Sequence, residues 1–246
     1  MINKVLLIGG SGNLGSHIIK SKYFLNIKYP SKKYLNILNK KKIEKYLLKN
    51  DFNLVLHCAA MARVTECEEN RKKAKKINVD GTRNIVNSII KTNKKKKKNI
   101  KLIFISSDAV YPSTKGNYKE NDNLAPYNFY GKTKLEGEKI VKKLKNYIII
   151  RTRFFDKSKI SFKYSATNIY TSSLEVNILV KYLFRLIDID FKGIINVGRK
   201  KISDYSNYKK FKKNLRPCDK SKIFNKLNFK IASDASMNIS KLSKIL

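Results

Sequence analysis

The sequence predicts an α/β fold in which a doubly wound parallel sheet is covered by helices. Three observations predict it: apolar runs of strand length, amphipathic segments that alternate with them, and glycines directly after the first run. Strands buried on both faces are continuously apolar, and strands that alternate with helices form parallel sheets through crossover connections. A chain of 246 residues, 42% of them hydrophobic, suffices for one such domain with a small appendage.

Apolar runs and amphipathic segments predict the elements in order. The runs predict buried strands at residues 4–8, 53–60, 100–107 and 146–152. Helices are predicted between them, at residues 13–23, at 43–50, over a long stretch ending at Lys91, and from 130 to 144. Residues 157–246 are less regular, with a helix near 173–188, a strand at 193–197 and a polar tail.

The net charge of +37 comes from 47 lysines and only eight arginines. A specific nucleic-acid surface favours arginine, which grips phosphate and guanine with two parallel hydrogen bonds. Here the lysines are spread over every predicted helix and loop, so they indicate ordinary solvent-facing positions and no specific nucleic-acid partner. The densest run, residues 91–99, is predicted to be a solvated loop before the third strand.

Three cysteines, Cys58, Cys67 and Cys218, have no CxxC spacing and are odd in number. That pattern is typical of a reduced chain without a disulfide framework or a zinc site. No apolar run reaches the roughly 18 residues of a membrane-spanning helix, and the first apolar run is too short for a signal peptide. We therefore expect a cytoplasmic chain with no metal site and no membrane insertion.

The segment "VLLIGGSGNLGSHI" is the first that carries chemistry. Gly9, Gly12 and Gly15 give a G-x-x-G-x-x-G spacing, and Gly10, Gly12 and Gly15 also give G-x-G-x-x-G. Between a strand and a helix, such glycines let backbone amides approach a pyrophosphate at the helix N-terminus. A plain glycine turn is the alternative, but the strand–loop–helix setting favours a Rossmann-like dinucleotide site.

The cofactor preference rests on residues 23–37. Sheets that bind NAD usually place an acidic residue about 20 positions after the glycines, where it grips the ribose hydroxyl. This stretch has no acidic residue, while Lys32 and Lys33 lie in it. The missing acid favours NADP over NAD as the nicotinamide cofactor.

The second segment that carries chemistry is "NFYGKTKLEGEK", with Tyr130 four residues before Lys134. Chance alone predicts about two or three such pairs in so lysine-rich a chain. The chain has five: Tyr29/Lys33, Tyr111/Lys115, Tyr130/Lys134, Tyr205/Lys209 and Tyr208/Lys212. Only the third opens a predicted helix and follows a serine at the end of a strand. Its alternative is a surface tyrosine on a lysine-rich helix.

With these segments in view, the chain resembles the extended short-chain dehydrogenases/reductases, and among them the dTDP-4-dehydrorhamnose reductase family. The blocks that carry the resemblance are "GGSGNLGSHI", "HCAAMARVTECEEN", "INVDGTRNIV", "ISSDAVYPSTKGNYKENDNLAPYNFYGKTKLEGE", "IIIRTRFF" and "DASMNISKL". They run across most of residues 1–155 and more thinly beyond. The resemblance implies an NAD(P)-binding Rossmann domain at 1–155 and a shortened substrate-binding portion at 156–246, interleaved with the last sheet elements.

The resemblance implies Ser107, Tyr130 and Lys134 as the catalytic set. A ketone that accepts hydride needs a proton at its oxygen as negative charge develops there. A free phenol has a pKa near 10, and an ammonium four residues along the same helix face lowers it. The serine hydroxyl holds the substrate oxygen, and Lys134 also reaches the nicotinamide ribose.

The same resemblance implies the residues that contact the cofactor. They are Gly9, Gly12, Asn13, Leu14, Gly15, Ala59, Ala60, Met61, Tyr130 and Lys134. Asn78 matches a family asparagine that is structural near the site. His57 is expected to be a packed strand residue, and neither it nor His17 has metal-ligand spacing.

One departure from the family bears on the substrate. Only about 16 residues separate Phe155 from the next shared helix, so part of one wall of the sugar-nucleotide pocket is expected to be missing. The expected function is reduction of a nucleotide-linked 4-keto-6-deoxy sugar for polysaccharide precursor synthesis, by a chain that can form a homodimer. Two alternatives stay open: a sugar-nucleotide epimerase or dehydratase of the same fold, and a non-catalytic subunit like the regulatory subunit of methionine adenosyltransferase. Asp108 is the only hint of a dehydratase, and the resemblance implies that the rhamnose-type reductases commonly have this acid too.

Overall fold

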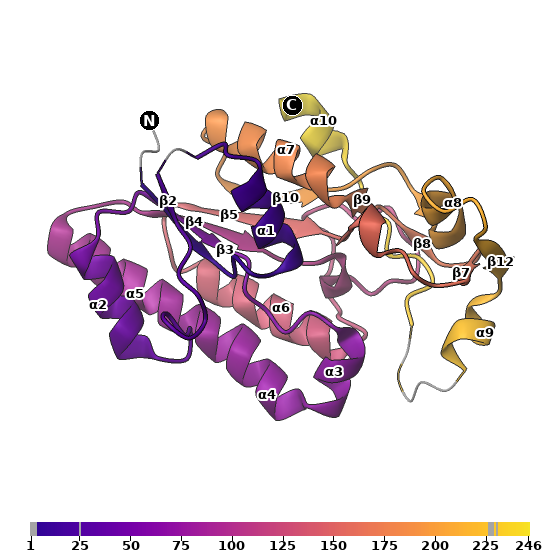
Figure 1. Cartoon of the computed structure of the whole chain (residues 1–246), viewed down its shortest axis with the longest axis horizontal. Coiled ribbons are helices and arrows are strands. Elements are labelled where there is room, and N and C mark those ends of the chain that lie inside the picture. The colour runs from indigo at the N-terminus through magenta and orange to yellow at the C-terminus, as the bar shows by residue number, and fades with distance from the viewer. Residues whose placement is uncertain (1–3, 25, 226–228, 230) are drawn as a thin grey trace.

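A six-stranded parallel sheet lies at the centre of the computed structural model, which describes residues 4–24, 26–225, 229 and 231–246 (Figure 1). Its strands are β1 Val5–Ile8, β2 Ile27–Lys28, β3 Leu54–His57, β4 Lys101–Ile105, β5 Tyr147–Thr152 and β10 Gly193–Val197. They lie in the order β10-β5-β4-β3-β1-β2, and every neighbouring pair is parallel. The chain winds one way from β1 to β2 and the other way from β3 to β10, which confirms the predicted doubly wound α/β fold.

Helices cover both faces of this sheet (Figure 1). On one face lie α1 Asn13–Lys20, α7 Val176–Asp188 and α10 Ser240–Ile245, and on the other α2 Lys40–Lys49, α5 Gly81–Lys96 and α6 Phe129–Val141. Successive strand residues point to opposite faces, so β1 divides its side chains between two cores. Leu7 packs in the core that includes Leu183 of α7, whereas Leu6 packs in the core that includes Ile85 of α5.

The long helix predicted to end at Lys91 is interrupted and extends further than expected. It consists of α3 Val64–Glu69, α4 Arg71–Lys75, a π-helix at Lys76–Asp80 and then α5, which continues to Lys96. The prediction of a loop over residues 91–99 was therefore wrong for most of that run. Lysine has good helix propensity, and cations in a last turn interact favourably with the helix dipole, so the run prolongs the helix until Lys97 adopts a left-handed conformation.

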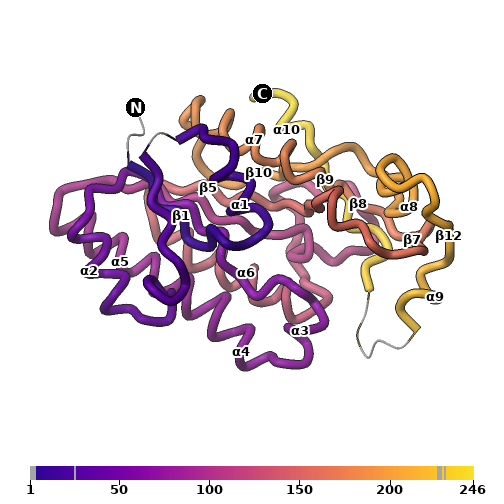
Figure 2. The backbone as a smooth tube through the Cα atoms, in the orientation of Figure 1, coloured from indigo at the N-terminus to yellow at the C-terminus, as the bar shows by residue number. Residues whose placement is uncertain are grey.

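The less regular C-terminal part contributes to two regions. α7, β10 and α10 complete the main sheet, whereas the remaining segments form a small lobe beyond the carboxyl ends of the strands (Figures 1 and 2). The lobe contains three two-stranded sheets, which pair β6 Phe154–Phe155 with β9 Leu174–Glu175, β7 Tyr164–Ala166 with β12 Arg216–Cys218, and β8 Tyr170–Thr171 with β11 Ile202–Ser203. Its helices are α8 Asp204–Lys209 and α9 Lys220–Phe224.

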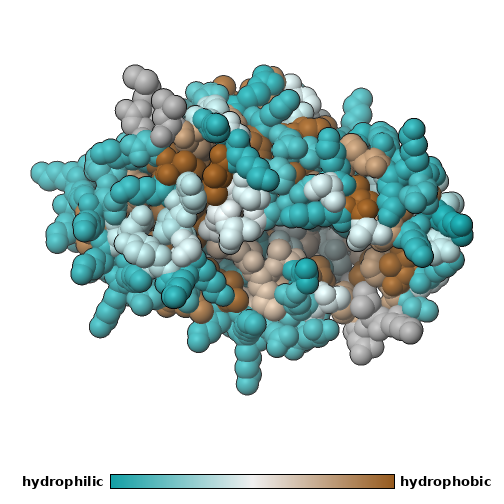
Figure 3. All heavy atoms as spheres, in the orientation of Figure 1, coloured by the Kyte–Doolittle hydropathy of each residue, from teal (hydrophilic) through white to brown (hydrophobic). Residues whose placement is uncertain are grey.

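The surface shows how the excess lysine is distributed. Hydrophilic side chains lie all around the visible face, with smaller hydrophobic areas between them, and do not form a single stripe (Figure 3). This distribution agrees with the interpretation of the charge as solvent-facing lysine. Among the residues that the structure describes, no helix is both long and apolar enough to cross a membrane.

Candidate active site

The glycine loop after β1 is packed so closely that two of its positions exclude any side chain. Gly9 has φ of +94°, and a Cβ atom there would lie 2.6 Å from the backbone nitrogen of Ala59. A Cβ at Gly15 would lie 2.2 Å from the carbonyl oxygen of Gly9. Gly12 precedes α1 as its N-cap and no side chain caps this helix, while Leu14 in the first turn is buried in the core. The loop is thus a backbone cradle open to an anion such as a pyrophosphate.

A second loop, after β3, lies against the cradle and is fixed by Asn78. Ala59, Ala60 and Met61 are partly exposed here. The Met61 amide donates to Asn78 Oδ1 at 2.8 Å, and Asn78 Nδ2 donates to the Met61 carbonyl at 3.0 Å and to Thr133 Oγ1 at 2.9 Å. Asn78 lies in the π-helix, a rare structure that is frequent at functional sites. It therefore ties the predicted cofactor loop to α6, which carries Tyr130 and Lys134.

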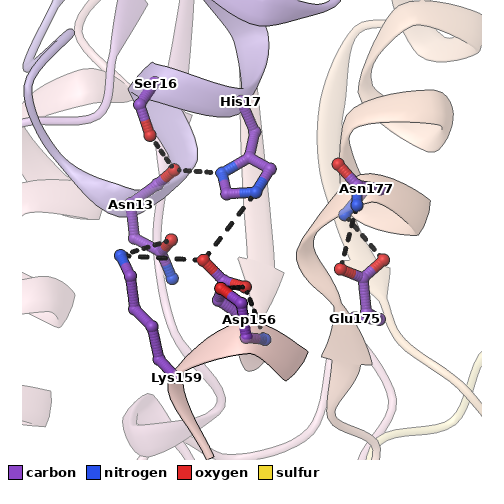
Figure 4. A network of polar contacts seen from close by, with 8 residues as sticks. Asn13, Ser16, His17, Asp156, Lys159, Glu175 and Asn177 are labelled. Carbon is purple, nitrogen blue, oxygen red and sulfur yellow. Dashed lines mark hydrogen bonds and ion pairs between the residues drawn. The ribbon is translucent and has the colours of Figure 1, made fainter.

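The lobe reaches the first turn of α1 through a polar network (Figure 4). Lys159 donates to Asn13 Oδ1 at 3.2 Å, and its ammonium lies 3.6 Å from Asp156 Oδ2. His17 Nε2 lies 3.8 Å from the same carboxylate oxygen. The segment just after β6 is thus joined to the helix end beside the glycine loop. Lys159 could not be predicted from a local pattern, because the contact joins residues 146 positions apart.

The hydroxyl groups of Ser107 and Tyr130 meet at the carboxyl end of β4. Ser107 is buried, accepts from the Ala109 amide at 3.1 Å and donates to Asp108 Oδ1 at 3.0 Å. Tyr130 lies in the first turn of α6, whose N-cap, Asn128, accepts from a backbone amide through its side chain. Burial raises the pKa of Tyr130 by more than a hydrogen bond with Ser107 lowers it, so the phenol is held protonated. The expected lowering of this pKa by the Lys134 ammonium was therefore wrong for this structure.

Lys134 lies one turn after Tyr130 but directs its ammonium elsewhere. The ammonium nitrogen is 4.0 Å from the centroid of the Phe104 ring. Burial lowers the pKa of Lys134 to about 8, opposed by the charge of Glu138 on the same helix. Within the described residues no hydrogen bond joins this ammonium to Tyr130. The structure therefore brings Ser107 and Tyr130 together, and directs the Lys134 ammonium to the ring of Phe104.

A cavity of about 480 Å³ lies between the loop after β4 and the small lobe. The loop at Pro112, helix α9 with Lys220 and Phe224, and residues near Ile231 line it together with Tyr127. Tyr127 stands three residues before Tyr130 and influences its pKa, whereas neither Ser107 nor Tyr130 lines the cavity. The cavity is of ligand size, and Tyr127 is its nearest lining residue to Tyr130 in the sequence.

The family model that matches the chain is the RmlD substrate binding domain, over residues 3–179. The chain belongs to this family. Among curated relatives of this RmlD-family chain, methionine adenosyltransferase 2 subunit beta of Bos taurus is 31% identical over 147 residues, which is 56% of the chain and 42% of that protein. The dTDP-4-dehydrorhamnose reductase of Aggregatibacter actinomycetemcomitans is 29% identical over 157 residues, 61% of the chain and 50% of that enzyme. The matched region is thus half or less of these relatives.

Solved structures match the RmlD-family chain along almost its whole length. A dTDP-4-dehydrorhamnose reductase from Clostridium acetobutylicum has a TM-score of 0.86 at 23% identity, covering 98% of this chain and 92% of that one. A hypothetical dTDP-4-dehydrorhamnose reductase from Sulfolobus tokodaii has a TM-score of 0.83 at 26% identity, covering 99% and 94%. The expected loss of part of the pocket wall after Phe155 stays a prediction.

Beneath the site of this RmlD-family fold lies a buried ion pair. Arg151, 1% exposed, donates to the two carboxylate oxygens of Glu138 at 3.0 and 2.7 Å and to the Tyr111 hydroxyl at 2.9 Å. Ser106 Oγ donates to Glu138 at 2.6 Å. The network joins β5, α6 and the end of β4, and so fixes the backbone immediately before Ser107.

Sequence reasoning missed Arg153 and Asp204, which the fold brings toward Asp108. Arg153 follows β5, and one of its guanidinium nitrogens lies 3.6 Å from Asp204 Oδ2. The only sequence signal for Arg153 was the segment "RTR" at the end of a strand, in which Thr152 separates two arginines. His57 is packed as expected, with Nε2 3.0 Å from Thr82 Oγ1 and a pKa that burial lowers to about 3. Among the described residues no His, Cys, Asp and Glu cluster could hold a metal ion.

Proposed function

We propose that the protein is an NAD(P)H-dependent reductase of a nucleotide-linked 4-keto-6-deoxy sugar. The observation that carries the proposal is the hydroxyl pair of Ser107 and Tyr130 in a chain of the RmlD family, which also has an anion cradle after β1 and a cavity lined by Tyr127. Its structural neighbours include reductases named for such a sugar, one of them in complex with NADP. In this proposal residues 1–155 hold the cofactor and residues 156–246 complete the substrate site.

The residues around the cradle fit a dinucleotide. Gly9, Gly12 and Gly15 leave space for a pyrophosphate where any Cβ would collide or crowd, and the uncapped start of α1 supplies amides and positive potential. The first turn with Asn13 and Leu14, and the loop at Ala59, Ala60 and Met61, complete the cofactor-binding set. The exposed Lys32 and Lys33, with no acid after β2, support a preference for a 2′-phosphate, and so for NADP. The bound nicotinamide supplies the hydride.

The chain's own residues deliver the proton. When substrate binds, Ser107 turns its hydroxyl hydrogen from Asp108 to the keto oxygen and holds that oxygen beside Tyr130. The phenol, protonated because burial raises its pKa, gives its proton to that oxygen as negative charge develops there. Lys134, whose pKa burial lowers to about 8, is still largely charged at pH 7 and stabilises the phenolate that remains.

A substitution tests this assignment. Tyr130→Phe removes the proton donor and keeps the ring, so we expect kcat to fall by about 10²–10⁴-fold with little change in cofactor affinity. Turnover is followed by the absorbance of NADPH with dTDP-linked 4-keto-6-deoxy sugars, and cofactor affinity by calorimetry. Tyr147→Phe is the matched control and keeps full activity, because Tyr147 lies at the amino end of β5 and the site lies at the carboxyl ends of the strands. A fully active Tyr130→Phe enzyme would overturn the role of Tyr130.

A second candidate is a non-catalytic cofactor-binding subunit. Two observations favour it: several curated relatives are the beta subunit of methionine adenosyltransferase 2, and the Lys134 ammonium faces Phe104 with no hydrogen bond to Tyr130 among the described residues. A panel of nucleotide-linked 4-keto sugars with NADPH and NADH separates the two functions. Oxidation of the cofactor by any of them supports the reductase, whereas tight cofactor binding without turnover supports the subunit.

A further inference from the structure

Three charged side chains from different elements form a cluster, and one of them, Asp108, lies next to the hydroxyl pair. Asp108 follows β4, Arg153 follows β5, and Asp204 begins α8 in the small lobe. A guanidinium nitrogen of Arg153 lies 3.6 Å from Asp204 Oδ2. Asp108 accepts from the Ser107 hydroxyl at 3.0 Å, and its charge acts on both Arg153 and Tyr130. The cluster of Asp108, Arg153 and Asp204 therefore borders the atoms that carry the proposed reaction.

Hydrogen-bonding capacity in this cluster is left unused. Asp108 is 5% exposed and its Oδ2 has no partner among the described residues, and the same holds for Oδ1 of Asp204, which is 8% exposed. The Arg153 side chain is 35% exposed and makes no hydrogen bond within the described part of the chain. Buried carboxylate oxygens are nearly always paired, because leaving one unpaired destabilises the fold. Two such oxygens beside an open guanidinium point to a ligand.

The mixture of charges indicates which part of a nucleotide sugar fits. A diphosphate would pair with Arg153 but would be repelled by two carboxylates next to it. A sugar ring suits the cluster better, since its hydroxyls donate to carboxylate oxygens and accept from a guanidinium. The keto carbon must lie at Ser107 and Tyr130, so the hydroxyls on neighbouring ring carbons come within reach of this cluster.

We infer that Arg153 and Asp204, with Asp108, bind the ring hydroxyls of the sugar and determine which sugar the site accepts. This inference rests on the proposed function, because it takes the ligand to be a nucleotide-linked sugar. It assigns the recognition of the sugar to a residue after β5 and to one in the lobe, so that the lobe takes part in selecting the ring as well as in enclosing it.

Calorimetry with two probes tests this assignment. dTDP-rhamnose and dTDP are titrated, each in the presence of NADP⁺, into the wild-type chain and into Arg153→Lys and Asp204→Asn. A lost charge-assisted hydrogen bond should weaken dTDP-rhamnose about 10- to 100-fold, with dTDP changed less than about twofold. Arg83→Lys, in an exposed ion pair on α5, is the control and changes neither affinity. Thermal unfolding of each variant verifies that it is folded.

The outcomes distinguish a failure of this inference from a failure of the proposed reductase function. Selective loss of dTDP-rhamnose affinity in either folded variant supports the inference. Equal weakening of dTDP and dTDP-rhamnose would place Arg153 at the phosphates and overturn it, as would unchanged affinities in both variants. If the wild-type chain binds NADP⁺ but neither dTDP probe, the proposed function fails and the inference fails with it.

Discussion

Arg151 and Arg153 stand two residues apart at the end of one strand, yet their surroundings are opposite. Arg151 is buried and hydrogen-bonded to Glu138 and Tyr111, and Glu138 accepts in addition from Ser106. Arg153 is one-third exposed, and within the described residues it has a single ion-pair contact, at 3.6 Å, and lies near carboxylate oxygens without hydrogen-bond partners. The first region is complete in the protein alone and holds the fold, whereas the second becomes complete only with a ligand. An arginine that stabilises the fold and an arginine that we assign to ligand binding thus lie on either side of Thr152.

The largest change in stability is expected when the hydrogen-bonded ion pair of Arg151 and Glu138 is broken. Glu138→Gln leaves the Arg151 charge buried without its carboxylate, which should lower the free energy of unfolding by about 3–5 kcal/mol. Urea unfolding followed by circular dichroism measures this. Asp80→Asn, which breaks the exposed pair with Arg83, is the matched control and should lose less than about 1 kcal/mol. Equal losses in the two variants would remove the distinction between the regions.

A change of opposite sign in the free energy of unfolding is expected for substitution of Lys134, in the candidate active site. The folded-state pKa of about 8 lies below the ordinary 10.5, so the charged form is disfavoured in the folded state. Lys134→Met should therefore raise the free energy of unfolding at pH 7, by at most about 3 kcal/mol, while turnover is lost. The wild-type chain gains stability as the pH rises from about 8 toward 10.5, so the advantage of the variant shrinks over that window. Urea unfolding at pH 7, 9 and 10.5 measures it, and a constant difference would contradict the prediction.

A smaller gain in the free energy of unfolding is expected for Asp204→Asn. Burial raises its pKa by more than Arg153 lowers it, so the folded state favours the protonated acid. The wild-type chain then loses stability as the pH rises from the ordinary carboxyl value through the raised one, and Asp204→Asn does not. We expect the variant to be more stable by about 1 kcal/mol at pH 7, with the difference shrinking toward pH 4. Urea midpoints across this range test it, and a variant less stable at pH 7 would count against it.

The smallest effect concerns the contact between the lobe and the cofactor loop. Lys159 is exposed, so Lys159→Gln should change the free energy of unfolding by less than about 0.5 kcal/mol. The loss of a cation beside Asn13 should weaken NADP⁺ about threefold by calorimetry. Lys157→Gln, in the same short turn, is the control. An identical change in both variants would attribute the effect to general charge and not to the contact with Asn13.

Local patterns explain how far prediction from the sequence reaches. The glycine loop and the four apolar runs were recognisable because strand, turn and helix signals are each contained within a few residues. The π-helix and the extension of α5 to Lys96 were not predicted, since lysine suits a helix end as well as a loop. Arg153 could not be distinguished from Arg151, because the strand ends between them at Thr152 and only the distant Asp204 gives Arg153 its setting.

The π-helix at Lys76–Asp80 has a consequence for how this site could have arisen. A π-turn holds one residue more than the α-helical turn that it replaces, so it can be gained or lost by a single-codon insertion or deletion. Deleting one residue there would restore regular α-helix, turn Asn78 away from Met61 and Thr133, and release the loop after β3 from α6. The reading frame would be kept and the helix would remain, so this one step of ordinary sequence drift could alter the site without dismantling the fold.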